Sequence, residues 1–215
     1  MSYQIIYADP AWKFNDQNQN GNRGASCKYD VMSLEQMKAM PVADMAAADC
    51  TLFMWHVPAM PLEALELVKA WGFTLKTMKA FTWVKLNKRF FNNLQREFRV
   101  SQIDLQTMPE ERLLQLLMAA TKIGLGHWTR GNTEDCLIAV RGKPKRQGKG
   151  VRQLIIEPIR EHSRKPDCTR DRIVELMGDL PRVELFARQN HPGWHAWGNE
   201  VEHSIPLLTA CNKAA

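Results

Sequence analysis

The sequence predicts an α/β protein built on a doubly wound, mostly parallel sheet. Strand-like and helix-like segments alternate over its first 86 residues, and polar residues collect just beyond the ends of several apolar runs. Chains with this alternation fold into parallel sheets covered by helices. In such sheets, binding sites form beyond the carboxyl ends of the strands.

The first strand is expected over residues 3–8, which are apolar and β-prone. Ser33-Leu34-Glu35-Gln36 resembles a capping box that opens a short helix, and Pro41 ends that helix. A buried second strand is expected over residues 51–57, a compact apolar run. Together these segments begin the alternation on which the fold prediction depends.

The spacing of residues 61–71 predicts a helix that stops at Gly72. Its core-facing side is expected to carry Leu62, Leu65 and Val68. Residues 73–86 alternate and are β-prone, which predicts one or two further strands.

Residues 87–125 break this rhythm and predict an inserted helical element. Its first part is basic, and a leucine-rich helix follows, opened by Thr107-Met108-Pro109-Glu110. A basic insertion can grip a phosphate backbone, whereas an apolar helix can pack on the core or on a second subunit. Packing on the chain's own core is the commoner outcome. Strands at 135–141, 153–158 and 182–188 and a helix at 169–177 complete the expected fold.

Composition indicates a globular protein in a reducing compartment. The chain has 215 residues, 45% of them apolar, which fits one domain over residues 1–215. Its five cysteines are scattered without a CxxC pair, which argues against disulfides and a structural zinc site. No signal peptide or membrane-spanning run is apparent, so a cytoplasmic location is expected. The net charge of +6 permits an anionic partner.

Asp9-Pro10-Ala11-Trp12 is the strongest candidate site, because it directly follows the first expected strand. Proline restricts the backbone, so the Asp9 carboxylate and the Pro10 carbonyl can be held side by side. Trp12 offers a flat face on which a base could stack. Two acceptors beside an aromatic plate suit the exocyclic amine of a nucleobase. The alternative is a plain turn followed by a core tryptophan.

Two polar loops are further candidates. Residues 13–28 are rich in Asn, Gln and Gly and could form a lid or a surface loop. Residues 141–152 carry six basic side chains and no acid, which fits either a phosphate-contacting loop or a solvated loop. His191 and His195 have the spacing of helical metal ligands, but Pro192 and Gly193 make a helix improbable. We therefore expect no metal.

Eleven separated segments, in order, resemble one family: the adenine-N6 methyltransferases of the mRNA methyladenosine writers (MT-A70-like) and their bacterial and phage relatives that methylate DNA. The hallmark of the family is Asp-Pro-Pro-Trp, which matches residues 9–12. The remaining segments are Tyr29-Asp30-Val31-Met32-Ser33, Leu52-Phe53-Met54-Trp55, Trp71-Gly72-Phe73, Trp83-Val84-Lys85, Gly126-His127-Trp128, Glu134-Asp135-Cys136-Leu137, Val140-Arg141-Gly142-Lys143-Pro144, residues 160–167, Glu184-Leu185-Phe186-Ala187-Arg188, and residues 193–200. The resemblance covers nearly the whole chain except residues 87–125.

The resemblance implies a Rossmann-like methyltransferase fold with a permuted motif order, in which the catalytic strand precedes the cofactor-binding strand. It assigns Asp9, Pro10 and Trp12 to the target base and implies S-adenosylmethionine as the cofactor. The expected cofactor-binding residues are Lys165, Leu185, Phe186, Arg188, Asn190, His191, Asn199 and Glu200. Asp9 and the Pro10 carbonyl would accept the two hydrogens of the adenine amine, so that its lone pair faces the sulfonium methyl group. A base in duplex DNA must first be flipped out.

The chain departs from the family pattern at two of these positions. Ala11 replaces the second proline of the hallmark, which loosens the loop and predicts weaker preorganisation. Glu200 stands where the family often has Gln, and a carboxylate there can still accept from ribose hydroxyls.

The function expected first is site-specific methylation of adenine N6 in DNA by the bacterial or phage branch of this family. RNA as the substrate, and a catalytically silent nucleic-acid-binding subunit, remain as alternatives. A homodimer is expected from the resemblance only. The basic residues expected to bind nucleic acid are Lys13, Lys143, Lys145, Arg146, Lys149, Arg160 and Arg164.

Overall fold

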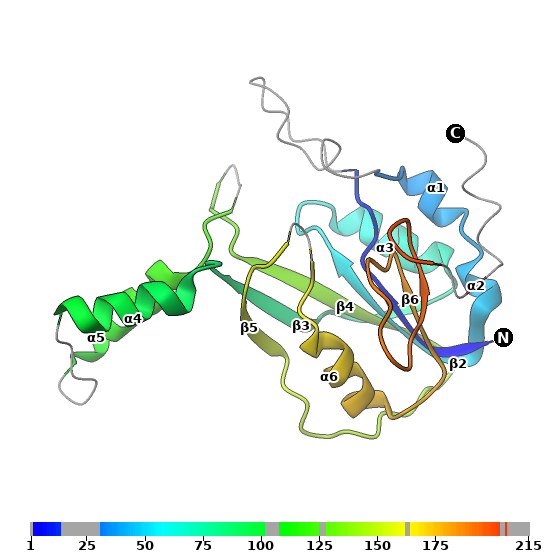
Figure 1. Cartoon of the computed structure of the whole chain (residues 1–215). Helices are drawn as coiled ribbons and strands as arrows, with labels where there is room; N and C mark the ends of the chain where they lie inside the picture. Colours follow the sequence, from blue (N-terminus) through cyan, green and yellow to red (C-terminus); the bar gives the residue numbers. More distant parts are fainter. Residues whose placement is uncertain are drawn as a thin grey trace.

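The computed structural model describes residues 2–13, 31–101, 108–124, 128–161, 164–202 and 205. The loop expected as a lid at 13–28 lies outside them, apart from Lys13. Seven strands form one sheet in the order β5-β3-β4-β2-β1-β6-β7. They are β1 (Tyr3–Ala8), β2 (Ala46–His56), β3 (Thr74–Leu86), β4 (Thr133–Arg141), β5 (Leu154–Pro158), β6 (Arg182–Leu185) and β7 (His195–Trp197). The six helices in the described residues are α1 (Leu34–Lys38), α2 (Val42–Met45), α3 (Pro61–Ala70), α4 (Phe90–Ser101), α5 (Glu110–Ala120) and α6 (Cys168–Met177) (Figure 1).

The sheet is mostly parallel, as predicted, with one reversed strand. β1 pairs parallel with β2 and β6, β6 with β7, and β3 with β5. Only β4 runs the other way, because it pairs antiparallel with both β2 and β3. β3 and β4 follow each other in the chain, so they form a long hairpin whose connection contains α4 and α5 (Figure 1).

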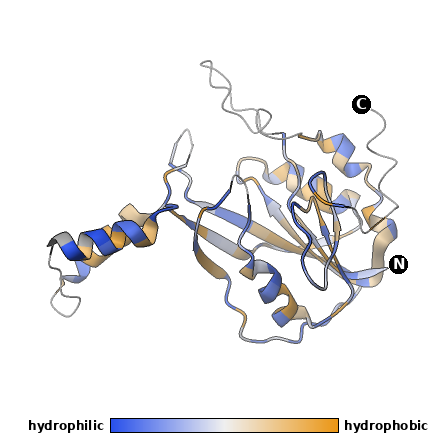
Figure 2. Ribbon diagram, in the orientation of Figure 1, coloured by the Kyte–Doolittle hydropathy of each residue, from blue (hydrophilic) through white to orange (hydrophobic). Residues whose placement is uncertain are grey.

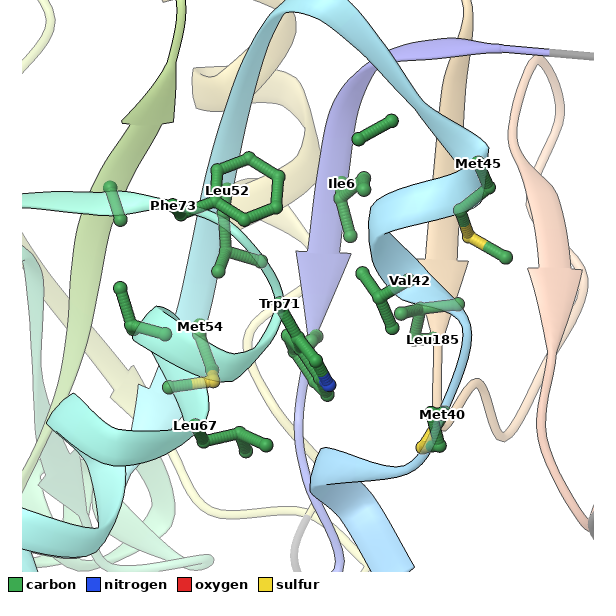
Figure 3. Close-up of a cluster of buried hydrophobic side chains, with 14 of the residues drawn as sticks. Ile6, Met40, Val42, Met45, Leu52, Met54, Leu67, Trp71, Phe73 and Leu185 are labelled. Atoms are coloured by element: carbon green, nitrogen blue, oxygen red, sulfur yellow. The ribbon is translucent and has the colours of Figure 1, made fainter.

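Both faces of the sheet are buried at the central strands β1 and β2, which explains why these strands read as continuous apolar runs. Successive side chains of a strand point to opposite faces. Ile6 and Leu52 therefore lie in one core cluster with α2 and α3, shown in Figure 3, while Tyr7 and Phe53 lie in a second cluster with Ile173 of α6. The sheet thus lies between helices on both sides, as a doubly wound fold requires.

The predicted capping box at the start of α1 is confirmed. The Ser33 hydroxyl accepts from the Gln36 amide, and the Gln36 side chain accepts from the Ser33 amide. The helix ends at Lys38, three residues before Pro41.

The face predicted for α3 is wrong at two of its three positions. Leu62 and Leu65 are 70% and 38% exposed, and the buried positions are Ala64, Leu67 and Val68. The buried stripe is set by Trp71, which follows the helix directly and is fully buried, with its indole N–H donating to the Met37 carbonyl at 2.9 Å. Residues three and four positions before Trp71 share its side of the helix, so Leu67 and Val68 face the core with it.

Several element boundaries also differ from the predictions. β2 begins at Ala46, five residues before the predicted start, and the single strand β3 covers the stretch for which one or two strands were expected. β6 ends at Leu185, three residues early, because Phe186 turns the chain at a φ of 61°. α2, α4 and β7 were not predicted.

The inserted element forms a helical arm, by which we mean α4 and α5. At its root the end of β3 pairs antiparallel with the residues that follow α5, because Asn87 N–H donates to the Ala120 carbonyl and Lys122 N–H to the Lys85 carbonyl. From there both helices extend away from the sheet (Figure 1). None of the α5 side chains is buried, so the expectation that this apolar helix packs on the chain's own core is wrong. No helix in the described residues is long and apolar enough to cross a membrane.

Candidate active site

The candidate site lies at the edge of the sheet where the carboxyl ends of β1, β2, β3 and β6 meet. Asp9 directly follows β1, and Phe186 directly follows β6. The reversed strand β4 adds residues from its beginning instead of its end, since Asp135 pairs with His56 at the end of β2. Glu134, one residue earlier, therefore reaches the same edge as Asp9.

An ion pair between Asp9 and Lys165 is the centre of this edge. Lys165 Nζ lies 2.6 Å from Asp9 Oδ2, and the side chains are 8% and 24% exposed. Lys165 comes from the segment between β5 and α6, and its ammonium lies 5.7 Å from the centroid of the Trp55 ring. Charge-assisted bonds in such partly dry surroundings are short and strong. The ion pair between Lys165 and Asp9 therefore connects the loop before α6 to the end of β1.

The pair extends into a chain of alternating charges. Lys165 Nζ lies 3.4 Å from Glu134 Oε2, and Glu134 Oε1 accepts from the ammonium of Lys85 at the end of β3. Burial raises the pKa of the Glu134 carboxyl, but the Lys165 and Lys85 ammonium groups together bring it below its ordinary value. Burial likewise raises the pKa of Asp9, and Lys165 opposes that shift. The two carboxylates outweigh burial at Lys165 and raise its pKa, so it stays protonated.

A second ionic group supports the floor of the site. Arg170 of α6 donates two parallel bonds to Glu184 of β6, at 2.7 and 2.6 Å, and its guanidinium lies 5.6 Å from the Tyr7 ring centroid. Asp167 accepts from Arg160 at 2.5 Å and from Arg170 at 3.2 Å. Burial raises the pKa of Glu184, and Arg170 opposes this shift. A bidentate pair of this kind fixes the relative orientation of its two side chains and also neutralises their charges. The pair therefore holds α6 against β6.

The ends of β6 and β7 form the outer wall. Phe186 adopts a left-handed backbone with a φ of 61°, which non-glycine residues rarely do and which is typical of functional sites. Arg188 Nε donates to Glu200 Oε1 at 2.7 Å and joins the two strand ends. Gly198 packs so closely against Ala187 that a side chain there would clash with the Ala187 carbonyl oxygen.

These elements enclose one cavity with mixed polar and apolar walls. Its lining residues are Tyr7, Asp9, Glu161, Arg164, Lys165, Asp167, Arg170, Glu184, Phe186, Arg188, Gln189, His191 and Glu200. They include five carboxylates and four permanent cations, a formal excess of one negative charge. S-adenosylmethionine carries two positive groups and one carboxylate, so the lining complements its charge. Phe186 and Tyr7 supply the apolar surface that its adenine and methyl groups require.

The sequence pattern of the MT-A70 family matches residues 3–122 and 105–200. The chain belongs to the MT-A70 family. It is 30% identical to the type II methyltransferase M.MunI of Mycoplasma over 96% of this chain and 82% of that protein. It is also 25% identical to an Arabidopsis thaliana N6-adenosine-methyltransferase MT-A70-like protein and 24% identical to the human N6-adenosine-methyltransferase catalytic subunit METTL3. The chain covers 93% and 96% of its own length in these two matches but about a quarter of theirs, 24% and 29%.

Most of the residues that the resemblance assigned to the cofactor lie in the cavity. These are Lys165, Phe186, Arg188, His191 and Glu200, and Asp9 lines it too. Three others do not line it: Leu185 is fully buried in the core, and Asn190 and Asn199 are exposed. Burial and the nearby Arg170 charge lower the pKa of His191.

The structure changes the interpretation of Trp12. Its side chain is 5% exposed, and its indole N–H donates to the Trp55 carbonyl at 3.2 Å. The open face that base stacking requires is therefore covered, and Trp12 holds the hallmark loop against β2. Pro10 is buried, and its carbonyl accepts from the Trp12 amide at 2.8 Å. A carbonyl oxygen has two lone pairs, so this bond uses one of the two acceptor positions of Pro10.

The basic residues expected to bind nucleic acid fall into two places. Lys13 is exposed directly after the hallmark loop, whereas Arg160 and Arg164 are held by Asp167 beside the cavity. Lys143, Lys145, Arg146 and Lys149 follow the end of the reversed strand β4, where Arg141 pairs with Cys50 near the start of β2. They lie at the edge of the sheet opposite Asp9. A role for them in nucleic-acid binding stays a prediction.

Sequence reasoning gave no role to Glu134 or Arg170. It counted Lys85 only among the basic residues of the insertion, and Glu184 only as the first residue of the segment that the resemblance assigns to the cofactor. Glu134 and Glu184 stand within segments that match the family, and Lys85 ends another. A signal was present, because charged residues in β-prone segments are rarely buried unless they are paired. The partners could not be read, because they come from strands and helices far apart in the chain. Among the described residues, no group of three or more His, Cys, Asp or Glu side chains could hold a metal ion.

Proposed function

We propose that this chain transfers a methyl group from S-adenosylmethionine to N6 of adenine in DNA. The observation that carries the proposal is the position of Asp9 at the wall of the charge-complementary cavity, held there by Lys165 at 2.6 Å. The family membership supplies the reaction class, and the residues present fit the cofactor. S-adenosylmethionine supplies an electrophilic methyl group on a sulfonium sulfur when it is bound.

Within the cavity, the cations and the carboxylates would bind different groups of S-adenosylmethionine. Arg188 and Lys165 suit the methionine carboxylate, and Glu200 suits the ribose hydroxyls. Glu184 supplies negative potential that favours a sulfonium. Exclusion of water by Tyr7 and Phe186 strengthens these interactions.

Asp9 would act on the adenine amine. Its Oδ2 bonds Lys165, so Oδ1 is the oxygen that we assign to one hydrogen of the amine, and the Pro10 carbonyl accepts the other. These bonds draw the nitrogen toward a tetrahedral shape and direct its lone pair at the methyl carbon. As the nitrogen–carbon bond forms and the carbon–sulfur bond breaks, the amine gains a positive charge. The surplus proton then leaves to Asp9 or to solvent. Positioning and electrostatic stabilisation account for most of the acceleration in such a site.

The assignment to DNA rests on the pattern of relatives. The identity to the bacterial type II methyltransferase is higher than to the adenosine methyltransferases, and the match covers 82% of that protein instead of about a quarter. This favours the bacterial branch that the sequence resemblance associates with DNA. RNA is the second candidate, because relatives named N6-adenosine-methyltransferases match nearly the whole chain.

The test is a competition between polymers. The chain is incubated with S-adenosylmethionine labelled in its methyl group and an equal mixture of DNA and RNA, and the nucleosides are then separated. Labelled N6-methyldeoxyadenosine supports the proposal. Label in N6-methyladenosine alone would show that the substrate is RNA and not DNA. It would leave the proposed reaction unchanged. Absence of label despite measurable cofactor binding would favour a silent subunit.

A further inference from the structure

The first helix of the arm, α4, has two sides of different character. Phe90, Leu94 and Phe98 stand four residues apart and are half-buried, so they share its more buried side. The opposite side is an exposed polar stripe, whose members are Asn92, Gln95, Arg96 and Arg99. At the 3.6 residues per turn of an α-helix, these four positions fall within about 100° of its circumference. Figure 2 shows apolar and polar residues along both helices of the arm.

The polar stripe differs from the outer side of an ordinary surface helix. Such helices usually carry Glu and Lys, which form ion pairs three or four residues apart. The stripe instead consists of one Asn, one Gln and two Arg, without a carboxylate. Within the part of the chain that the structure describes, none of these four side chains forms a hydrogen bond or an ion pair. Their donors and acceptors therefore face solvent and can bind a ligand.

Asn, Gln and Arg are the residue types that recognise base edges in the major groove of DNA. Arg binds O6 and N7 of guanine with two parallel bonds, and Asn or Gln binds N6 and N7 of adenine in the same way. The major groove of B-DNA, about 12 Å wide, admits one α-helix. From Asn92 to Arg99 the stripe is about 10 Å long, which corresponds to about three base pairs at ~3.4 Å each.

The arm begins at the edge of the sheet that holds Asp9. α4 starts four residues after the end of β3, and from there the arm extends away from the sheet (Figure 1). Lys85, near the end of β3, belongs to the chain of charges that runs through Glu134 and Lys165 to Asp9. The root of the arm is therefore beside the position proposed for the target base, where a helix that reads the flanking base pairs must start.

We propose that α4 is a recognition helix that enters the major groove beside the target adenine, where the polar stripe reads about three base pairs. Lys88 and Arg89, exposed between β3 and α4, would bind phosphates at the border of the groove. Glu110 and Glu111 begin the other helix of the arm and repel phosphates, so we assign the groove to α4 alone.

This inference rests on the proposed function and narrows its substrate to duplex DNA. The major groove of an RNA helix is deep and narrow, and side chains cannot read it. The polar stripe thus assigns sequence specificity to a part of the chain that does not line the cofactor cavity.

The test is the flanking-sequence preference of methylation. The full chain is incubated with S-adenosylmethionine and a pool of duplexes in which the base pairs around one adenine are randomised, and the methylated duplexes are sequenced. The wild-type chain should prefer particular bases at about three adjacent positions. Arg96→Lys with Arg99→Lys keeps both charges but removes the planar fork of each guanidinium. This variant should lose at least about fivefold in kcat/KM for preferred over other sequences.

Two further variants separate base reading from charge and from folding. Arg112→Lys makes the same change on α5 and should leave the preference as in wild type. Lys88→Ala with Arg89→Ala should weaken binding to all sequences alike and reduce its dependence on salt. Circular dichroism and S-adenosylmethionine binding report whether each variant is folded.

The outcomes distinguish this inference from the proposed function. DNA methylation with the same flanking preference in wild type and in Arg96→Lys with Arg99→Lys would overturn the recognition helix and leave the proposed function standing. Equal methylation of all flanking sequences by the wild-type chain would do the same, as would methylation of single-stranded DNA only. If the wild-type chain methylates no DNA at all, the proposed function fails and the recognition helix fails with it.

Discussion

The Lys165 ammonium bonds Asp9 Oδ2 at 2.6 Å, although the two residues are 156 positions apart in the chain. Lys165 thus both lines the cavity and supports the proposed catalytic carboxylate. Its second carboxylate contact, Glu134 at 3.4 Å, links that support to Lys85 at the root of the arm. One buried cation therefore couples four segments of the fold.

Replacement of Lys165 by Met should destabilise the protein. The change leaves the Asp9 and Glu134 carboxylates without their shared cation, and removing one partner of a buried pair is costly. Because Asp9 retains 24% exposure, we expect a loss of about 2–3 kcal/mol, less than for a fully buried pair. Urea unfolding at neutral pH measures the difference. Lys38→Met, at a more exposed pair on α1, is the matched control and should lower the free energy of unfolding much less. Equal losses in the two variants would contradict the account.

The contribution of Glu134 to stability should depend on pH. Its folded-state pKa lies below the ordinary 4.5, so the carboxylate stabilises the fold fully above that value. The contribution is lost as the pH falls through the folded-state pKa. Wild type should therefore exceed Glu134→Gln in the free energy of unfolding at pH 7, and the gap should narrow below pH 4.5. If the difference in the free energy of unfolding between wild type and Glu134→Gln instead increased as the pH fell, this interpretation would be refuted.

Gly198→Ala should weaken cofactor binding. The added methyl group clashes with the Ala187 backbone and must separate the strand ends that Arg188 and Glu200 join. We expect a loss of roughly 1–3 kcal/mol in stability and a higher Kd for S-adenosylmethionine by calorimetry. Gly150→Ala is the control, since nothing lies within 4 Å of the added atom. If both variants bind the cofactor equally well, the strand ends do not shape the cavity.

Trp12→Phe tests whether the Trp12 side chain stabilises the fold or stacks on the target base. The change removes the donor to the Trp55 carbonyl and part of a buried ring. A loss of about 1–3 kcal/mol in the free energy of unfolding is expected. The KM for DNA should change little relative to Trp128→Phe, at a fully exposed tryptophan. A large rise in KM without loss of stability would restore the stacking role.

Part of this site could be predicted because the residues that indicate it are consecutive in the sequence. β1 is an apolar run that ends in Asp9, so both the strand and the position of the acid at a strand end were visible in consecutive residues. The capping box at Ser33 was predictable for the same reason. The family resemblance added Lys165 and Arg188, whose place in the cavity no local pattern reveals.

The other features of the site depend on the directions of the strands, which the alternation of apolar residues does not encode. Because β4 is reversed, Glu134 reaches the Asp9 edge, while Lys143 and Lys145 are carried to the opposite edge. The burial of Trp12 depends on a bond to Trp55, 43 residues away. The exposure of α5 follows from where the β3–β4 hairpin points, which the leucine spacing of the helix cannot show.

The central claim is that Asp9 acts on the adenine amine and not on the cofactor. Its most direct test is the single-turnover rate of N6-methyladenine formation in Asp9→Ala, with S-adenosylmethionine affinity measured on the same protein. Asp44→Ala, at an exposed acid on α2, is the control. The account predicts that Asp9→Ala binds the cofactor within about threefold of wild type and loses at least about a hundredfold in rate. Formation of N6-methyladenine by Asp9→Ala at close to the wild-type rate would contradict it.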